Sequence, residues 1–172
     1  PTGPLTVGHG RGAVFGDTVA NLLEWTGHDV TREYYFNNAG RQMRVLGDSV
    51  RLRYLEFIGQ PVTFPDDYYQ GTYIRDIAHH LFEAHGAALA GEPPEGKFKE
   101  QAEHDIFDDI KGTLKRLGIE FQSFYNENSL YESGKIKHVI VYLRAKNLVY
   151  DKEGALWLRT GEFGGAQVKV FV

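Results

Sequence analysis

Apolar side chains recur at helical spacing in two stretches of the first 60 residues, with a strand-like stretch between them. The first stripe lies between Gly8 and Trp25 and consists of Phe15, Val19, Leu22 and Leu23. Gly27 follows it, as glycine commonly does at the end of a helix. Residues Val30 to Phe36 are rich in β-branched and aromatic side chains, which is typical of a strand. The second stripe ends at Gly59 and consists of Met43, Leu46, Val50, Tyr54 and Ile58. A strand between two helices predicts an α/β fold.

Beyond residue 60 the pattern predicts mainly helices. A loop is expected from Gln60 to Gly71, and the stretch from Ala87 to Gly96, which contains two adjacent prolines, is expected to be a surface linker. Helical stripes occupy residues 74–82, 98–117 and 136–143, and a short strand is expected at 119–124. Residues 148–158 are typical of a β-hairpin that turns at Asp151-Lys152-Glu153-Gly154. We therefore predict a change of organisation near residue 60.

Composition narrows the possible functions. The chain is 42% hydrophobic and 24% charged, as is usual for a globular protein, and it contains no cysteine, so disulfides and thiolate metal sites are excluded. No apolar run approaches 18 residues, which argues against a membrane span. The first residues show no signal-peptide pattern, and a cytoplasmic location is expected. The formal net charge of −4 is unlike that of most nucleic-acid-binding domains, so most contacts to nucleic-acid phosphates would have to lie elsewhere or on a local patch.

One segment combines glycines with a histidine at the start of a predicted helix, from Gly8 to Gly12. Unpaired backbone N–H groups and the helix dipole make such a start a natural anion site. Gly8 would let a flat ring or a phosphate approach the backbone, and His9 could donate a hydrogen bond to a phosphate. A plain loop before a helix is the alternative that these residues alone leave open.

Two histidine clusters could suggest metal. Asp76, His79 and Glu83 share one face of a predicted helix at a spacing that can bind a cation, but a solvated polar face is the favoured interpretation. His104 and Asp108, four residues apart, are expected to form a surface pair. We predict no metal site from the sequence.

Several short words run through the chain in a definite order. The signature-like word is Thr6-Val7-Gly8-His9, which is similar to the His-x-Gly-His signature of class I aminoacyl-tRNA synthetases. The words around it are Pro1-Thr2-Gly3-Pro4-Leu5, Gly10-Arg11-Gly12-Ala13, Gly16-Asp17 and the run from Asp29 to Gln42. Later words are Tyr69-Gln70-Gly71-Thr72-Tyr73-Ile74, Leu117 to Phe121, Ser129 to Gly134 and Gly154 to Thr160. In this order and spacing the chain resembles the bacterial arginyl-tRNA synthetases from residue 1 to about residue 164.

The resemblance implies a fold and a reaction. Residues 1–60 would be a partial Rossmann-like nucleotide-binding core, and residues 61–172 a mainly helical connective insertion with a C-terminal hairpin. Arginine would attack the α-phosphate of ATP, with Mg²⁺ on the nucleotide, and the arginyl group would then pass to tRNA(Arg). His9 and Thr6 would be catalytic, and Gly8, His9, Gly10 and Gly12 would bind ATP. No tightly bound cofactor is expected, and no residue is assigned to arginine selection.

Three features depart from the family pattern. Thr6 replaces the first histidine of the signature, Asn38 stands where aspartate is usual, and the residues after Gly164 differ from the family's acidic stretch. We expect this chain to be inactive alone, because the family's Lys-Met-Ser-Lys-like loop lies outside its residues. The alternatives are an inactive remnant or binding module that keeps the fold, and another adenylyl-transferring enzyme of the same superfamily.

The resemblance also places the first core strand before residue 1. The strand from Val30 to Phe36 would then have an open edge, and open edges recruit strands. The β-prone stretch Val168 to Val172 could cover it, in the same chain or from a second copy. We therefore expect either a self-associating chain or a C-terminal stretch that is paired where it would not lie in the intact enzyme.

Overall fold

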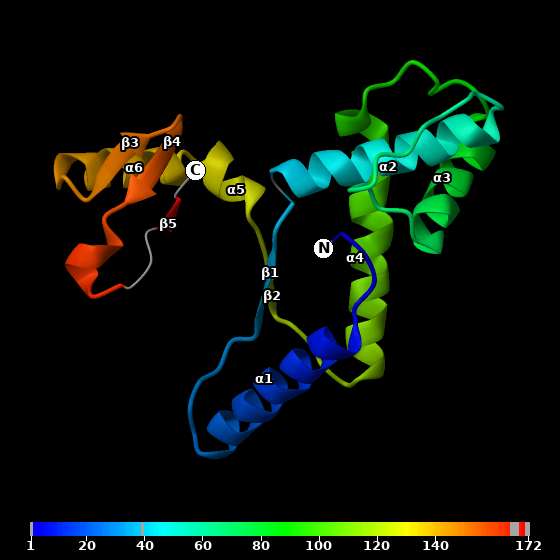
Figure 1. The fold of residues 1–172 in the computed structure, drawn as a ribbon. Coiled ribbons are helices and arrows are strands. Elements are labelled where there is room, and N and C mark those ends of the chain that lie inside the picture. Colours follow the sequence, from blue (N-terminus) through cyan, green and yellow to red (C-terminus); the bar gives the residue numbers. More distant parts are fainter. Residues whose placement is uncertain (1, 39, 166–168, 171–172) are drawn as a thin grey trace. The chain divides into compact units, whose positions relative to one another are not determined.

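The computed structural model describes residues 2–38, 40–165 and 169–170 of the 172 in the chain (Figure 1). The described chain divides into two compact units, Pro1–Glu127 and Asn128–Val172. In the first unit the elements are α1 (Val7–Trp25), β1 (Glu33–Phe36), α2 (Arg41–Phe57), α3 (Thr72–His85), η1 (Pro94–Phe98), α4 (Lys99–Arg116) and β2 (Ser123–Asn126). In the second they are α5 (Asn128–Glu132), α6 (Lys135–Ala145), β3 (Val149–Lys152), β4 (Ala155–Leu158), η2 (Thr160–Phe163) and β5 (Lys169–Val170).

Helices α2, α3 and α4 form the core of the first unit. Their apolar stripes meet in one cluster of buried side chains, with Leu46 and Val50 from α2, Ile74 from α3 and Ile110 from α4. The helices that flank residue 60 therefore share a single core. The predicted change of organisation at residue 60 does not coincide with a boundary between compact units, which falls after Glu127.

Two strands cross this unit beside the helices (Figure 1). β1 and β2 pair in parallel, with Tyr34 opposite Phe124, although about 90 residues separate them along the chain. The strand predicted at 30–36 is confirmed only from Glu33, and the strand predicted at 119–124 lies a few residues later, at Ser123–Asn126. The α/β character of the unit is therefore present, with one two-stranded parallel sheet beside the helices.

The segment 87–96, predicted to be a surface linker, packs in part against the helical core. Leu89 is buried against the helices, and its N–H donates to the Tyr54 hydroxyl at 3.1 Å. The correction has a simple cause: Tyr54 presents a buried hydroxyl that needs partners, and this segment supplies them.

Gly47 in α2 is required by close packing. A Cβ built there would lie 2.3 Å from the backbone oxygen of Pro94 and 3.0 Å from the Cβ of Lys99. The glycine therefore allows η1 to pack directly on α2.

This contact reverses the usual effect of a Gly-to-Ala change in a helix. We expect Gly47→Ala to lower the free energy of unfolding by about 1–3 kcal/mol, because a fixed backbone atom must move. Gly112→Ala in α4 is the matched control: no heavy atom lies within 4 Å of the added Cβ, so the variant should gain about 0.5–1 kcal/mol. Urea denaturation followed by circular dichroism measures both, and equal signs would contradict the packing argument.

The second unit is a small helical and antiparallel unit. The predicted hairpin is confirmed: β3 and β4 pair antiparallel, and the turn between them has left-handed backbone at Glu153 and Gly154. The predicted last helix is confirmed as α6. β5 adds to the far edge of β4, with Val170 opposite Trp157.

The pairing of β5 concerns the C-terminal stretch, residues 168–172, which was expected to cover the open edge of the strand at 30–36. Its described residues, Lys169 and Val170, pair with β4, and β1 pairs with β2. Residues 169 and 170 therefore do not pair with the strand at 30–36 of their own chain, and coverage of that strand by a second copy stays a prediction. Residues 168, 171 and 172 lie outside the described residues, and self-association stays a prediction.

Candidate functional site

The glycine- and histidine-containing word lies inside the first turns of a helix. α1 begins at Val7, with Thr6 in extended backbone as its N-cap residue. The sequence predicted a glycine turn that precedes the helix, but Gly8, Gly10 and Gly12 are all helical. The placement of His9 in the first turn and the end of the helix at Trp25 are confirmed.

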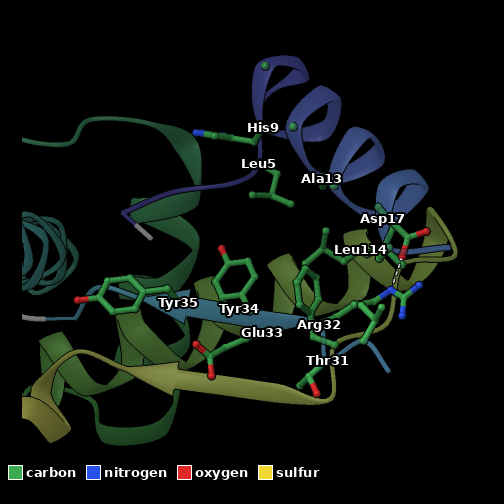
Figure 2. A pocket seen from close by; sticks show the side chains of 17 residues that line it. Leu5, His9, Ala13, Asp17, Thr31, Arg32, Glu33, Tyr34, Tyr35 and Leu114 are labelled. Atoms are coloured by element: carbon green, nitrogen blue, oxygen red, sulfur yellow. Dashed lines mark hydrogen bonds and ion pairs between the residues drawn. The ribbon is translucent and has the colours of Figure 1, made fainter. Parts of the chain in front are cut away.

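Thr6 holds the ring of His9. The backbone N–H of Thr6 donates to Nδ1 of His9 at 3.1 Å, and the Thr6 hydroxyl lies 3.1 Å from the same nitrogen. Because Nδ1 accepts a hydrogen bond, the proton of the neutral imidazole is on Nε2. Both side chains are exposed, and the His9 ring extends sideways from the helix start (Figure 2). His9 therefore offers a donor to a ligand that binds at this end of α1.

A pocket of about 610 Å³ lies between α1 and β1 (Figure 2). Gly8, His9 and Gly12 line it together, and their role in binding ATP stays a prediction. Gly10 does not: it lines a separate hollow beside Arg11 on another face of α1. The reason is helical periodicity, since residues four apart share a face and residues two apart do not.

The face of α1 toward this pocket is made of very small residues. Apart from His9 and Asp17, it carries Gly8, Gly12, Ala13, Gly16 and Ala20. A Cβ at Gly12 or Gly16 would meet nothing within 4 Å, and none of the three glycines has a positive φ. Glycine in a helix costs roughly 1 kcal/mol relative to alanine. Packing within the described chain therefore does not explain these glycines, whereas close approach of a ligand or another backbone does.

The opposite faces of α1 carry an apolar stripe that is exposed. Phe15 is 72% exposed and Trp25 is 88% exposed, and Ala20 is the buried residue of the helix. The stripe predicted the helix correctly, but it does not pack on the described part of the chain.

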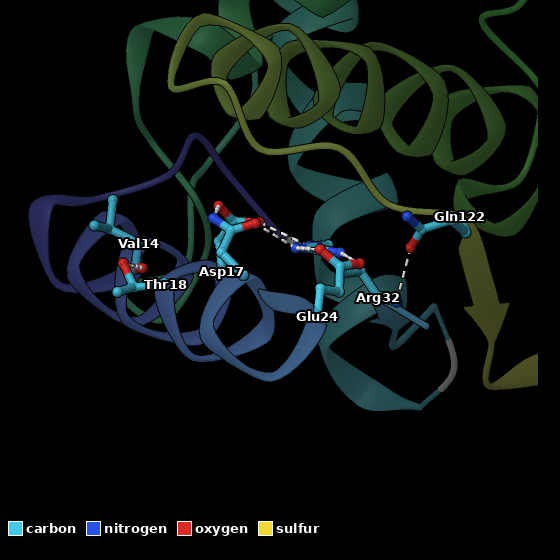
Figure 3. Close-up of polar contacts among 7 residues, drawn as sticks. Val14, Asp17, Thr18, Glu24, Arg32 and Gln122 are labelled. Atoms are coloured by element: carbon cyan, nitrogen blue, oxygen red, sulfur yellow. Dashed lines mark hydrogen bonds and ion pairs between the residues drawn. The ribbon is translucent and has the colours of Figure 1, made fainter. Parts of the chain in front are cut away.

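Polar groups hold α1 against the start of β1 (Figure 3). The Arg32 guanidinium donates to Asp17 at 2.8 Å, to Asn21 at 2.6 Å and to Glu24 at 2.6 and 3.0 Å. These hydrogen bonds to Arg32 hold the pKa of Glu24 below its ordinary value. The stabilisation that Glu24 gains from Arg32 is therefore fully present above the ordinary pKa of a glutamate. It is lost as the pH falls through the lowered pKa of Glu24.

The backbone of Arg32 also joins the two strands. Its N–H donates to the side-chain oxygen of Gln122 at 2.7 Å, and its carbonyl accepts from the N–H groups of Gln122 and Ser123 at 3.0 and 3.2 Å. Arg32 thus links α1, β1 and the start of β2.

The segment ahead of α1 is fixed by α3. The Tyr73 hydroxyl donates to the carbonyl of Thr2 at 2.7 Å, and a Cβ at Gly3 would lie 3.0 Å from that hydroxyl. Leu5 packs against the core cluster. The entry into α1 is therefore anchored next to the signature-like word.

Aromatic rings close the pocket on the β1 side. Tyr34 lies edge-on to Phe121, with ring centroids 5.4 Å apart, and packs near Phe124. Burial raises the pKa of the Tyr34 hydroxyl, so it is a neutral donor at neutral pH.

The other clusters are polar surface contacts. His79 lies 3.5 Å from Glu83, and His104 lies 3.5 Å from Asp108, which confirms the predicted surface pair. Among the residues that the structure describes, no group of three or more His, Asp or Glu is arranged to hold a metal ion. Within the same residues, no helix is both long and apolar enough to cross a membrane.

Arg32 and its partners are functional candidates that the sequence pattern alone did not reveal. The available signal was the spacing of Asp17, Asn21 and Glu24, which recur at i, i+4 and i+7 on one face of α1. Such a polar face needs a partner when it turns inward, and only the fold shows that Arg32 supplies it.

Comparison with known proteins identifies the family. The sequence profile described as "tRNA synthetases class I (R), catalytic domain" matches residues 2–172. The chain belongs to this family.

Its relatives are much longer proteins. An arginine–tRNA ligase from Desulfotalea psychrophila is 57% identical over 172 residues, which are all of this chain and 31% of the relative. An arginine–tRNA ligase from Chlorobium phaeovibrioides is 52% identical over 177 residues and is covered to 32%. A solved structure from Campylobacter jejuni, provisionally assigned as an arginyl-tRNA synthetase, matches with a TM-score of 0.86 at 35% identity, covering all of this chain and 38% of that one. The chain thus spans about a third of the length of the curated relatives it matches.

Proposed function

We propose that this chain forms the ATP-binding part of an arginine–tRNA ligase. In the whole protein arginine would be activated to arginyl-adenylate and transferred to tRNA(Arg), with Mg²⁺ carried on the nucleotide. The observation that carries the proposal is the meeting of Gly8, Gly12 and His9 in one pocket at the start of α1. Family membership supplies the reaction.

The chemistry of this corner fits a nucleotide. The first N–H groups of α1 have no partner inside the helix, and the dipole places partial positive charge at the helix start. A neutral His9 with its proton on Nε2 can donate to a phosphate oxygen as negative charge develops. Gly8 leaves room for a flat base or a phosphate beside the backbone. The protein groups act here by position and charge, without a covalent intermediate.

The parallel pair β1–β2 with helices beside it is consistent with part of a Rossmann-like core. In such cores, ligands bind near strand ends next to the start of a helix. The division into a nucleotide-binding core at 1–60 and an insertion at 61–172 stays a proposal about family organisation.

A second candidate function is favoured by one observation. Thr6 replaces the first histidine of the signature, and its backbone and hydroxyl support His9 without supplying a second imidazole. A module that keeps the fold after losing catalysis would tolerate this change. The experiment below separates the two.

A chimera tests the proposed function. The Desulfotalea relative aligns over the same 172 residues, so this chain can replace the matching third of that enzyme. We expect the chimera to catalyse arginine-dependent ATP–pyrophosphate exchange, and Thr6→His to raise its rate by up to about 100-fold by restoring one donor. This chain alone should show no exchange. A stably folded chimera that is inactive both with Thr6 and with Thr6→His would overturn the proposal.

A further inference from the structure

α1, which carries the signature-like word and is called the signature helix below, is attached to the rest of its unit mainly by polar contacts. Of its 19 residues, Ala20 is buried, and Ala13 packs in part against the core cluster. The apolar side chains Phe15, Leu22 and Trp25 are exposed. Burial of large apolar side chains is what usually fixes a helix in place, and α1 contributes little of it.

The contacts that remain lie at the two ends of the helix. Ahead of α1, Leu5 and the Tyr73–Thr2 hydrogen bond anchor the entering chain. Beyond its middle, Asp17, Asn21 and Glu24 all receive hydrogen bonds from the one guanidinium of Arg32 (Figure 3). This guanidinium donates through all three of its nitrogens. Its side chain is 11% exposed and that of Asp17 is 18% exposed, so solvent screens this pair less than a surface pair.

We propose that Arg32 is the positioning residue of the signature helix and sets the place of His9 and Gly8 relative to β1. A planar guanidinium suits this task, because its fixed fork of donors can engage several acceptors at once and so defines a direction as well as a distance. Its backbone is held by Gln122 and Ser123, which couples the guanidinium to the base of the β1–β2 pair. A tilt of α1 about its anchored start would move the pocket-facing glycines away from Tyr34.

Arg32 and Asp17 also line the pocket, but at the end away from His9 (Figure 2). Asp17 follows Gly8 by nine residues, about 13.5 Å along an ideal helix, so Arg32 acts on the signature through the helix. The proposal rests on the proposed function only for its effect on nucleotide chemistry. The hold of Arg32 on α1 is independent of what the pocket binds.

Hydrogen exchange of the 172-residue chain tests the hold itself. We expect Arg32→Ala to speed amide exchange in the second half of α1 by about tenfold or more, while amides of α2 to α4 keep their protection. Arg32→Lys should lie between, because all the donors of an ammonium are on one nitrogen and cannot reproduce the spread of the guanidinium fork. Arg144→Ala is the matched control: it removes a bidentate pair with Asp151 in the second unit and should leave α1 unchanged. Unchanged α1 exchange in Arg32→Ala would overturn the proposal.

Should Arg32→Ala loosen the whole first unit, Glu24→Gln provides a milder variant. It keeps the shape of the side chain and removes its charge, so local opening of α1 is expected with smaller amplitude. Opening spread evenly over α1 and the α2–α4 core in both variants would show a general stability role and would overturn the proposal.

A double-mutant cycle in the chimera separates positioning from stability. If Arg32 acts through His9, Arg32→Ala should lower kcat by about 100-fold, and His9→Ala should then add less than about tenfold. Each substitution alone would thus have a larger effect than it has in the presence of the other. Effects that multiply independently would overturn the proposal even in an active enzyme. If the chimera is inactive, the hydrogen-exchange experiment still decides whether Arg32 holds α1 in place. The proposed function and the proposed role of Arg32 can therefore fail separately.

Discussion

Replacing His9 by alanine in the chimera is expected to lower arginine-dependent ATP–pyrophosphate exchange by about 100- to 1,000-fold. Nδ1 of His9 is occupied by the Thr6 N–H, so Nε2 is the donor that the substitution removes. The loss should appear in kcat as well as in kcat/KM, because the donor acts on charge that develops during the reaction. Steady-state exchange kinetics over a range of ATP concentrations measure both.

Two further variants make this result specific. His9→Gln keeps an N–H donor of similar reach and should retain more activity than His9→Ala. His28 lies beyond the other end of α1, where its ring contacts Thr26 and the Leu23 carbonyl, so His28→Ala should leave the rate unchanged. A loss of equal size in His28→Ala would show that the effect comes from the helix as a whole and not from the Nε2 donor.

Replacing Tyr54 by alanine is expected to lower the free energy of unfolding of the first unit by about 3–5 kcal/mol. The ring is fully buried and lies edge-on to Phe98, with centroids 5.3 Å apart. Its hydroxyl donates to the Gly86 carbonyl and accepts from the Leu89 N–H, so it also ties the segment after α3 to the core. Urea denaturation with a probe in the first unit measures the change.

Tyr54→Phe separates the hydroxyl from the ring. The Gly86 carbonyl and the N–H of the buried Leu89 would lose their partner, at a cost of about 1–3 kcal/mol. Tyr142 in α6 is 56% exposed, so Tyr142→Ala is the control and should change stability by about 0.5 kcal/mol or less. A neutral Tyr54→Phe would mean that water or a shifted backbone satisfies both groups.

The sequence by itself determined the local elements and the family. The stripes of α2, α3 and α4 were visible because residues three and four apart share a helix face, whatever packs on them. The hairpin was visible because residues 153 and 154 must adopt left-handed backbone, which glycine accommodates. His9 could be placed in the first helical turn for the same local reason. The signature-like word pointed to the family that the profile comparison then showed.

Only the tertiary structure decided which faces meet. The parallel pairing of β1 with β2 joins residues about 90 apart, and no local pattern specifies such a partner. The same holds for the core shared by α2, α3 and α4 and for the boundary between the two compact units, which follows Glu127. It holds also for Leu89, whose burial depends on a hydroxyl 35 positions away.

The site shows the same division between local and long-range information. Helical periodicity predicts that Gly8 and Gly12 share one face of α1 and that Gly10 lies on another. Only the fold shows which face lines the pocket. The apolar stripe of α1 predicted a helix and yet stays exposed, because an amphipathic pattern says that a face can be buried and not what is available to bury it. The role of Arg32 could not be predicted from the sequence, because its three acceptors lie on α1 and not beside it in the chain. A charged side chain acquires a structural role only when the fold brings its partners within hydrogen-bonding distance.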